Sequence, residues 1–218
     1  MSTPNRIVLG ITGASGSVYA IRLLQVLVKA GYETHLAVSP SGAAVLKQEC
    51  ALDLDTLAPD LESLVCCTPA WSNTEPIVDR DAVNAAVNEK QLCYHRHDDY
   101  MTPIASGSFR TNAMVICPCS GSTLSGISRA ASANLIQRAA DVHLKENRKL
   151  VLVPRETPLS VIQLQNMHHL AKSGAVILPA MPGWYHGVQS LDCLVDFIVS
   201  RILDQLEIDN SLMQRWGE

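Results

Sequence analysis

The chain has 218 residues, of which 47% are hydrophobic and 17% are charged, and its formal net charge is −4. Such a chain can bury a large core, so we predict one domain over residues 1–218, and the small negative charge excludes the electrostatic footprint of a nucleic-acid-binding protein. No apolar run approaches a membrane span, and residues 1–4 are too short and polar for a signal peptide, so we expect a cytoplasmic protein. The seven cysteines lack framework spacing, which indicates reduced thiols.

A buried strand that runs into a glycine-rich turn begins the chain. The apolar run Ile7-Val8-Leu9 predicts a strand covered on both faces, and the spacing of apolar residues from Val18 to Leu27 predicts a helix. Between them, Gly10, Gly13 and Gly16 permit sharp bends and a close approach to a ligand. Backbone N–H groups at the helix start suit a phosphate, and a tight turn without a ligand is the alternative.

The spacing of this turn disfavours a nicotinamide dinucleotide. Ile11 and Thr12 separate the first two glycines, which gives G-x-x-G-x-x-G instead of G-x-G-x-x-G. The next predicted strand, Glu33–Val38, ends at Ser39 and carries no carboxylate where a ribose diol would be held. The pattern favours a mononucleotide phosphate or another phosphorylated ligand.

The middle of the chain has weaker signals. Pro40 begins a small-residue run to Cys50 that predicts a helix, and residues 79–90 could form another, while the rest of residues 51–100 is not assigned. The segment from His95 to Asp99 suits either a metal site or a solvated loop, and we favour the loop. Cys117-Pro-Cys119 has no second pair at zinc-ligand spacing, so we expect no zinc site.

Two further turns are rich in small hydroxyl residues. Ser106-Gly107-Ser108 forms the first of them. The second is Ser120-Gly121-Ser122-Thr123, which follows a predicted strand over residues 113–117. Its hydroxyls are expected at the same carboxyl edge of a parallel sheet as the first glycine turn, where ligands bind. Capping of the next helix by Ser120 or Ser122 is the alternative.

A predicted helix over residues 134–147 carries cations on a semi-apolar face. Arg138 and Lys145 are seven residues apart and therefore share that face. The pattern predicts either a pocket or subunit boundary that needs cations, or an exposed face paired with Asp141 and Glu146.

The clearest functional signal follows the apolar strand predicted over residues 149–153. Arg155 and Glu156 come directly after it, at the edge where α/β sheets bind ligands, so we favour a functional role for both. Thr157 as N-cap and Pro158 at the first helical position predict a helix that runs to about residue 172.

The last predicted strand, residues 175–179, leads into an aromatic loop at the same edge of the sheet. Trp184 and Tyr185 lie in this loop, and Ser190 is expected to cap a final helix to about residue 206. Arg201 falls on the apolar face of that helix, where a cation needs an anionic partner.

Together these features suit an aromatic phosphorylated cofactor and a second anion. The chain also resembles the UbiX-type flavin prenyltransferases, once described as aromatic acid decarboxylases, over nearly its whole length and most weakly over residues 51–100. The motifs that carry this resemblance are T-G-A-S-G, S-G-S-F, P-C-S, R-A-A-D-V-x-L-K-E, V-P-R-E-T-P-L, P-x-x-x-Y-H and V-D-F-I-V-x-R-I-L-D-Q-L. The resemblance implies a flavodoxin-like three-layer α/β fold with a parallel central sheet, and a homododecamer with FMN at the subunit boundaries.

The resemblance also implies a reaction and its residues. A dimethylallyl group would pass from dimethylallyl monophosphate to N5 and then C6 of reduced FMN, without a metal, and the prenylated FMN would be handed to a UbiD-type decarboxylase. The residues that would hold FMN are Gly13, Ala14, Ser15, Ser39, Ser120, Gly121, Ser122, Thr123 and Arg155. Those that would hold the dimethylallyl phosphate are Ser106, Arg138, Lys145, Tyr185 and Arg201. The catalytic residues would be Glu156 and Ser15, which manage protons, and Lys145, which stabilises the leaving phosphate.

Two other functions compete with this interpretation. An FMN-dependent decarboxylase of a cysteine-type substrate would need a catalytic histidine shortly after the first helix and a capping loop, and the sequence shows neither. A flavin carrier without turnover would leave Glu156 and the second set of cations without a role.

Overall fold

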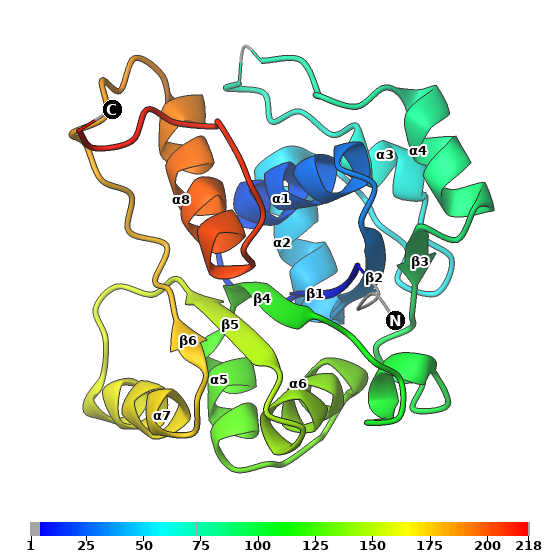
Figure 1. The fold of residues 1–218 in the computed structure, drawn as a ribbon, viewed down its shortest axis with the longest axis vertical. Helices are drawn as coiled ribbons and strands as arrows, with labels where there is room; N and C mark the ends of the chain where they lie inside the picture. The colour runs from blue at the N-terminus through cyan, green and yellow to red at the C-terminus, as the bar shows by residue number, and fades with distance from the viewer. Residues whose placement is uncertain (1–4, 73, 218) are drawn as a thin grey trace.

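A parallel six-stranded sheet forms the centre of the molecule (Figure 1). The computed structural model describes residues 5–72 and 74–217, so the expectation about residues 1–4 lies outside the described residues. The strand order is β3-β2-β1-β4-β5-β6, and every neighbouring pair is parallel. The strands are β1 (Arg6–Ile11), β2 (Glu33–Val38), β3 (Leu92–Tyr94), β4 (Ala113–Cys119), β5 (Lys149–Pro154) and β6 (Val176–Ile177).

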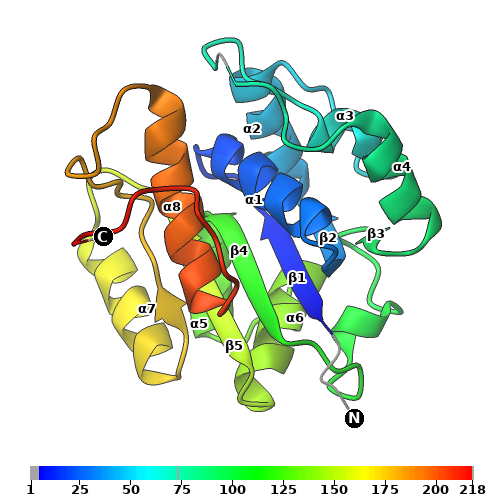
Figure 2. The same cartoon turned by 45° about the horizontal axis from the view of Figure 1, so that its top comes forward.

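Helices cover both faces of this sheet, as Figures 1 and 2 show. One face packs against α1, α2, α3, α4 and α8, and the other against α5, α6 and α7. In β1, Ile7, Leu9 and Ile11 enter the first core while Val8 enters the second, which confirms a strand buried on both faces. The helices are α1 (Ser17–Lys29), α2 (Pro40–Cys50), α3 (Leu61–Val65), α4 (Arg80–Asn88), α5 (Gly121–Ser128), α6 (Leu135–Lys145), α7 (Val161–Lys172) and α8 (Leu191–Gln205), and a 3-10 turn covers Pro103–Ala105.

The topology confirms the expected fold class. Apart from the short edge strand β3, the order β2-β1-β4-β5-β6 is that of a flavodoxin-like α/β fold. The direction of winding reverses between β1 and β4, so their carboxyl ends flank a crevice. This crevice is where the sequence places its first glycine turn and its second hydroxyl-rich turn.

Two element boundaries differ from the sequence prediction. The helix after β5 begins at Val161, because Ser160 and Gln163 form a capping box there, and Thr157 and Pro158 remain in the loop before it. The last regular strand is confined to Val176–Ile177, although the N–H groups of Leu178 and Ala180 still donate to the carbonyls of Leu152 and Pro154 of β5. Pro179 is tolerated between them because β6 is an edge strand.

The middle of the chain contains more structure than its sequence signalled. The helix expected over residues 79–90 is α4, whose N-cap is Asp79, while α3 and β3 had no prediction. The solvated-loop interpretation of residues 95–99 is wrong at His95, whose Nε2 lies 2.8 Å from Nδ1 of the buried His35. Pairing of β3 with β2 places the two rings side by side.

Candidate functional site

The crevice between β1 and β4 is fixed by one buried hydroxyl. Thr12 Oγ1 donates to the carbonyl of Pro118 at 2.7 Å and accepts from the backbone N–H of Ser120 at 2.8 Å. The hydroxyl therefore joins the turn after β1 to the turn after β4. Because both bonds are buried, the two turns hold a fixed distance from each other.

The start of α5 presents a cluster of hydroxyl groups. Ser120 Oγ accepts from the backbone N–H of Thr123 at 3.3 Å and lies 3.0 Å from its Oγ1 and 3.1 Å from Ser122 Oγ. Ser120 is thus the N-cap, as the capping alternative proposed, and Ser122 is exposed. Capping and ligand binding are compatible here, since the neighbouring hydroxyls and the helix dipole favour an anion at this position.

The start of α2 lies against the first glycine turn. Ser39 caps α2 through the N–H of Gly42 at 3.0 Å, and its Oγ lies 3.1 Å from that of Ser41. A Cβ on Gly13 would be only 2.5 Å from the Cβ of Ser41, so glycine is required for this approach. The hydroxyls of α2 are therefore brought beside the turn by the absence of one side chain.

The sequence predicts a phosphate at the start of α1, but a carboxylate of the chain itself occupies this position. The Glu49 carboxylate, from α2, accepts from the N–H of Gly16 at 3.0 Å and from that of Ser17 at 2.8 Å. The first N–H groups of α1 are therefore satisfied by the protein's own anion. A ligand phosphate is better served by the hydroxyl-lined starts of α2 and α5.

A cavity of about 370 Å³ opens beside this turn. Ser15 and Arg155 line it together, and Arg155 Nε donates to the carbonyl of Ser15 at 3.3 Å. Tyr19 also lines the cavity, and burial, with Cys117 and Glu49 adding to it, raises the pKa of its phenol. The phenol therefore stays neutral, and the cavity has a polar edge and an aromatic wall.

Glu156 lies at the carboxyl end of β5, beside Arg155, as its sequence position indicated. Its side chain is exposed and its carboxylate accepts from the N–H of Thr157 at 3.1 Å. In the single chain, Glu156 is thus at the outer rim of the site, where its carboxylate is accessible to a ligand or to another copy of the chain.

The predicted donor-binding residues form two separate groups. The α6 group consists of Ser106, Arg138 and Lys145. Arg138 Nε donates to the carbonyl of Ala105 at 3.1 Å, and a Cβ on Gly107 would lie 3.1 Å from Lys145 Nζ. The Ser-Gly-Ser turn therefore lies beside Lys145, and Ala105, just before the turn, contacts Arg138.

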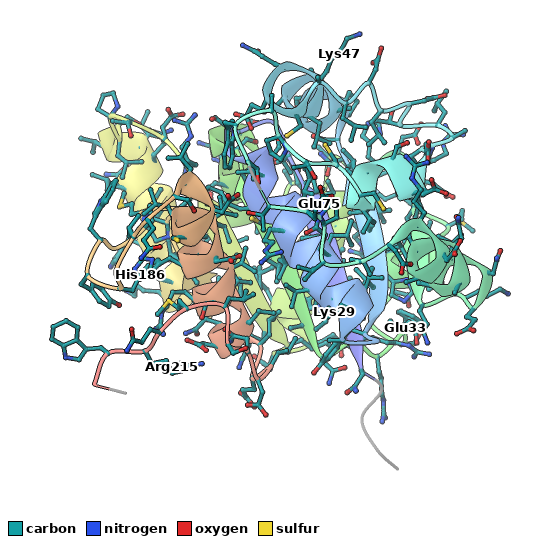
Figure 3. All side chains as sticks on the ribbon, turned by 90° about the horizontal axis from the view of Figure 1, so that it is seen from above. Lys29, Glu33, Lys47, Glu75, His186 and Arg215 are labelled. Atoms are coloured by element: carbon teal, nitrogen blue, oxygen red, sulfur yellow. The ribbon has the colours of Figure 1, made fainter. Side chains whose placement is uncertain are left out.

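The α8 group consists of Tyr185 and Arg201. The Tyr185 ring packs edge-on against Phe197 of α8 and against Trp216 near the carboxyl terminus. Figure 3 places His186, which follows Tyr185, beside α8. This group belongs to the opposite face of the sheet from α6.

Both groups of cations are paired locally within the chain. Arg138 contacts Asp141 at 3.3 Å and Lys145 contacts Glu146 at 2.8 Å, as the exposed-face interpretation predicted. Arg201 Nη1 lies 2.6 Å from the Asp204 carboxylate. The single chain therefore does not bring Lys145 and Arg201 together, because they lie on helices that cover opposite faces of the sheet.

The two cysteines of Cys117-Pro-Cys119 are structural in this chain. Cys117 and Cys119 are fully buried in β4, and burial raises the pKa of Cys119 to about 12. Such thiols stay protonated and unreactive. Within residues 5–72 and 74–217, no group of three or more His, Cys, Asp or Glu side chains is placed to hold a metal. In the same residues, no helix has the length and apolar character needed to cross a bilayer.

Sequence reasoning missed two contributors to the cavity, Glu49 and the aromatic Trp71. Both line it together with Ser15 and Arg155. Gly16 offers α1 no side-chain cap, and this is the signal that an anion from elsewhere must satisfy the helix start. Trp71 lies in the unassigned middle region and had no comparable signal.

Comparisons with known proteins find relatives over nearly the whole chain. Residues 1–203 match the family described as Flavoprotein. The chain is 45% identical over 210 residues, covering 96% of it and 92% of the relative, to flavin prenyltransferase UbiX of Halalkalibacterium halodurans. Among solved structures it is similar to AnUbiX (PadA1) in complex with FMN and dimethylallyl pyrophosphate, with a TM-score of 0.78, 35% identity and coverage of 99% and 98% of the two chains. It is also similar to a dodecameric FMN-dependent UbiX-like decarboxylase from Escherichia coli O157:H7, with a TM-score of 0.77, 34% identity and coverage of 98% and 100%.

Proposed function

The chain belongs to the Flavoprotein family and, within it, to the UbiX-type flavin prenyltransferases, and from this premise we propose how its residues carry out that reaction. The enzyme transfers a dimethylallyl group from a dimethylallyl phosphate to N5 and C6 of reduced FMN. The observation that carries the proposal is the crevice between β1 and β4, where three hydroxyl-rich segments and Arg155 meet.

The residues in this crevice fit FMN. The hydroxyls at the starts of α2 and α5 can donate to a phosphate and to ribityl oxygens, and both helix dipoles favour the phosphate charge. The cavity beside Ser15 and Arg155 has the aromatic and apolar wall that a planar ring system needs. FMN would be held by Gly13, Ala14, Ser15, Ser39, Ser120, Gly121, Ser122, Thr123 and Arg155.

The cations of the α6 and α8 groups would act on the donor phosphate. When the allylic C–O bond breaks, negative charge develops on the departing phosphate. Lys145 and Arg138, with Arg201, would stabilise this charge as it forms, while the hydroxyl groups of Ser106 and Tyr185 hold the phosphate oxygens. When it is bound, reduced FMN supplies the nucleophilic nitrogen and carbon that accept the dimethylallyl group.

Proton movements fall to Ser15 and Glu156. The bond to N5 would release the N5 proton, whereas the bond to C6 would need a proton added to the prenyl double bond before C6 loses its own, so the site needs groups that can both accept and donate a proton within reach of the ring. Ser15 lies at the cavity with Arg155, and Glu156 is the next residue along the chain. We assign the carboxylate of Glu156 as the acceptor and the hydroxyl of Ser15 as the group that relays the proton.

Assembly with other copies would complete the donor site. The solved UbiX-like relative from Escherichia coli is dodecameric, and in a closed assembly the α6 face of one copy can meet the α8 face of the next. Each local ion pair of Lys145 and Arg201 would then exchange its carboxylate for the donor phosphate. We propose a homododecamer with donor sites at the subunit boundaries.

The product requires a partner that uses it. Prenylated FMN is the product of the proposed transfer, and we propose that a UbiD-type decarboxylase receives it. Addition of apo-decarboxylase to the completed reaction would show transfer if decarboxylase activity rises only in samples that contain both FMN and the donor.

The central experiment is an anaerobic assay of purified protein with reduced FMN. Dimethylallyl monophosphate and dimethylallyl diphosphate are supplied separately, and the flavin is analysed by mass spectrometry. We expect a flavin heavier by one prenyl group with the monophosphate. Unchanged FMN with both donors would contradict the proposal, and CO₂ release from a cysteine-terminated peptide would favour the decarboxylase alternative.

A further inference from the structure

Residues 67–72 form a segment that passes over the start of α1. The segment follows α3 and runs along the outside of α1 in Figures 1 and 2. Ser72 Oγ donates to the Asp192 carboxylate at 2.6 Å, which ties the segment to the start of α8. Just before it, the buried Gln25 side chain of α1 donates to the carbonyl of Val65 at 2.9 Å. The segment is therefore anchored at both ends.

The two sides of this segment face different surroundings. A narrow space between the segment, α1 and α8 is lined by Thr68, Pro69 and Ser72, and further along by Glu75, which lies over α1 in Figure 3. Trp71 does not line this space. It lines the neighbouring cavity of about 370 Å³, together with Ser15 and Arg155, while Pro69 lines both spaces.

The exposure of Trp71 is unusual for such an anchored position. Its indole is 40% exposed, although Pro69 and Ser72 on either side are packed or hydrogen-bonded. A large aromatic side chain that faces a cavity and is left partly uncovered is suited to contact with an apolar or aromatic ligand. The cavity also has polar lining residues, Ser15, Glu49 and Arg155.

We propose that Trp71 packs against the ring system of the bound flavin in the cavity that it lines with Ser15 and Arg155. Ser15 and Arg155 hold the polar edge of the flavin, and the indole covers an apolar part of the ring, so that the acceptor atoms keep one orientation toward the donor. This inference rests on the proposed function, and it adds a flavin contact from a segment outside the motifs that carry the family resemblance.

The test uses oxidised FMN and its fluorescence. An indole in van der Waals contact with the flavin ring quenches flavin emission by electron transfer, whereas phenylalanine does not. The substitution Trp71→Phe keeps an apolar ring, so we expect bound FMN to become several-fold brighter while its dissociation constant changes little. Trp71→Ala removes the ring, and we expect the dissociation constant of FMN to become about tenfold larger. Circular dichroism of each variant reports its folding.

The chain supplies matched controls for this measurement. Its two other tryptophans, Trp184 and Trp216, are more exposed and do not line this cavity. Because they flank Tyr185 of the α8 group, Trp184→Phe and Trp216→Phe report the contribution of a neighbouring copy, and each should raise the emission of bound FMN less than Trp71→Phe does. Because the Tyr19 phenol can also quench, each variant is compared in a Tyr19→Phe background as well. Unchanged emission in Trp71→Phe in both backgrounds, or an equal rise in Trp184→Phe, would overturn the inference.

The two experiments separate a failure of this inference from a failure of the proposed function. Prenylated flavin formed by the wild-type protein decides whether the protein is the transferase, whatever Trp71 contacts. If prenylation occurs and Trp71→Phe does not alter the emission of bound FMN, only the inference fails. If the wild-type protein binds FMN with quenched emission but forms no prenylated flavin, only the proposed function fails.

Discussion

The flavin crevice is joined within one chain, whereas the cations proposed to bind the donor are kept apart in one chain. The crevice between β1 and β4 is held by buried bonds, such as those of Thr12 to Pro118 and Ser120. The cations Lys145 and Arg201 instead lie on helices that cover opposite faces of the sheet, each paired with its own carboxylate. We therefore infer that one chain supplies the hydroxyl-lined crevice proposed for FMN, and that donor activation is a property of the assembly.

The local ion pairs explain how separated cations are kept ready for a phosphate. Lys145 and Arg201 are about half exposed, at 49% and 45% of their side-chain surfaces, so their pairs contribute little to stability. An exposed pair is exchanged at low cost for a doubly charged phosphate in a site closed by another copy. A buried pair would resist this exchange.

The largest expected effect comes from mixing inactive variants. Lys145→Ala and Arg201→Ala should each lower turnover at least about 100-fold, because each removes a cation from the leaving phosphate. When the two variants are co-expressed and assembled together, about a quarter of the donor sites draw both wild-type cations from different copies. We expect about a quarter of the wild-type activity, measured as prenylated flavin formed.

The matched control mixes two variants of the same group. Lys145→Ala and Arg138→Ala both damage the α6 group, so no mixed site can contain both of these cations and activity should stay low. Flavin content, read from the absorbance of the purified protein, should match the wild type in every sample. If the Lys145 and Arg201 variants together recover nothing, both cations act from one chain and the comparison above is wrong.

Substitution of Gly13 should damage the crevice and not the cations. Gly13→Val would force its Cβ to within 2.5 Å of Ser41, so the start of α2 must move. We expect a loss of about 2–3 kcal/mol in the free energy of unfolding and loss of FMN from the purified protein. Gly174→Ala is the control, since it strains a positive φ in open space and should lower stability without releasing FMN.

Much of this crevice was predictable because its signals are local. The apolar run at Ile7 fixes a buried strand, the serine at Ser120 caps a helix, and the charges at Arg155 follow a strand directly. Each is read within a few residues, and a parallel sheet brings the carboxyl ends of its strands to one edge. The parallel α/β sheet and its ligand-binding edge follow from these signals, whereas the flavodoxin-like fold and FMN were implied by the family resemblance.

The parts that sequence did not reveal depend on contacts between distant residues. Glu49 reaches the start of α1 across more than 30 residues, and His95 meets His35 because β3 pairs with β2. Thr157 and Ser160 are both good N-caps, and only the reciprocal bond of Gln163 decides between them. The separation of Lys145 from Arg201 depends on which face each helix covers, and spacing along the chain does not encode that.

A smaller effect is expected from Glu49→Gln, which tests the anion at the start of α1. The substitution keeps the shape of the side chain but removes the charge that two backbone N–H groups share. We expect a loss of about 2 kcal/mol in the free energy of unfolding, measured by urea titration. Because this anion belongs to the chain and not to the ligand, FMN phosphate should remain bound. Loss of FMN together with unchanged stability would contradict the assignment.

The smallest expected effect is a change of stability with pH at the His35–His95 pair. This pair lies between β2 and β3, outside the flavin crevice and the donor-binding cations. Burial, with His35 next to it, lowers the pKa of His95 to about 4 from its usual value of 6.5, and burial also lowers the pKa of His35. In the folded chain His95 therefore stays neutral, whereas in the unfolded chain it binds a proton as the pH falls below about 6.5. The unfolded state binds more protons between pH 6.5 and 4, so stability falls as the pH falls through this window.

Urea titrations at pH 7.5 and 5.5 measure this loss, and comparison with His95→Gln assigns it. With allowance for the partial exposure of the ring, we expect His95 to account for about 1 kcal/mol of the decrease. The buried His143, whose pKa is also lowered to about 4, mainly by burial, contributes a separate decrease that remains in His95→Gln. The FMN dissociation constant of the wild type and of His95→Gln should be equal at pH 7.5, because the histidine pair does not line the flavin cavity. If the pH dependence of stability is identical in the two proteins, His95 binds its proton equally in the folded and unfolded chains, and its pKa is not lowered by folding.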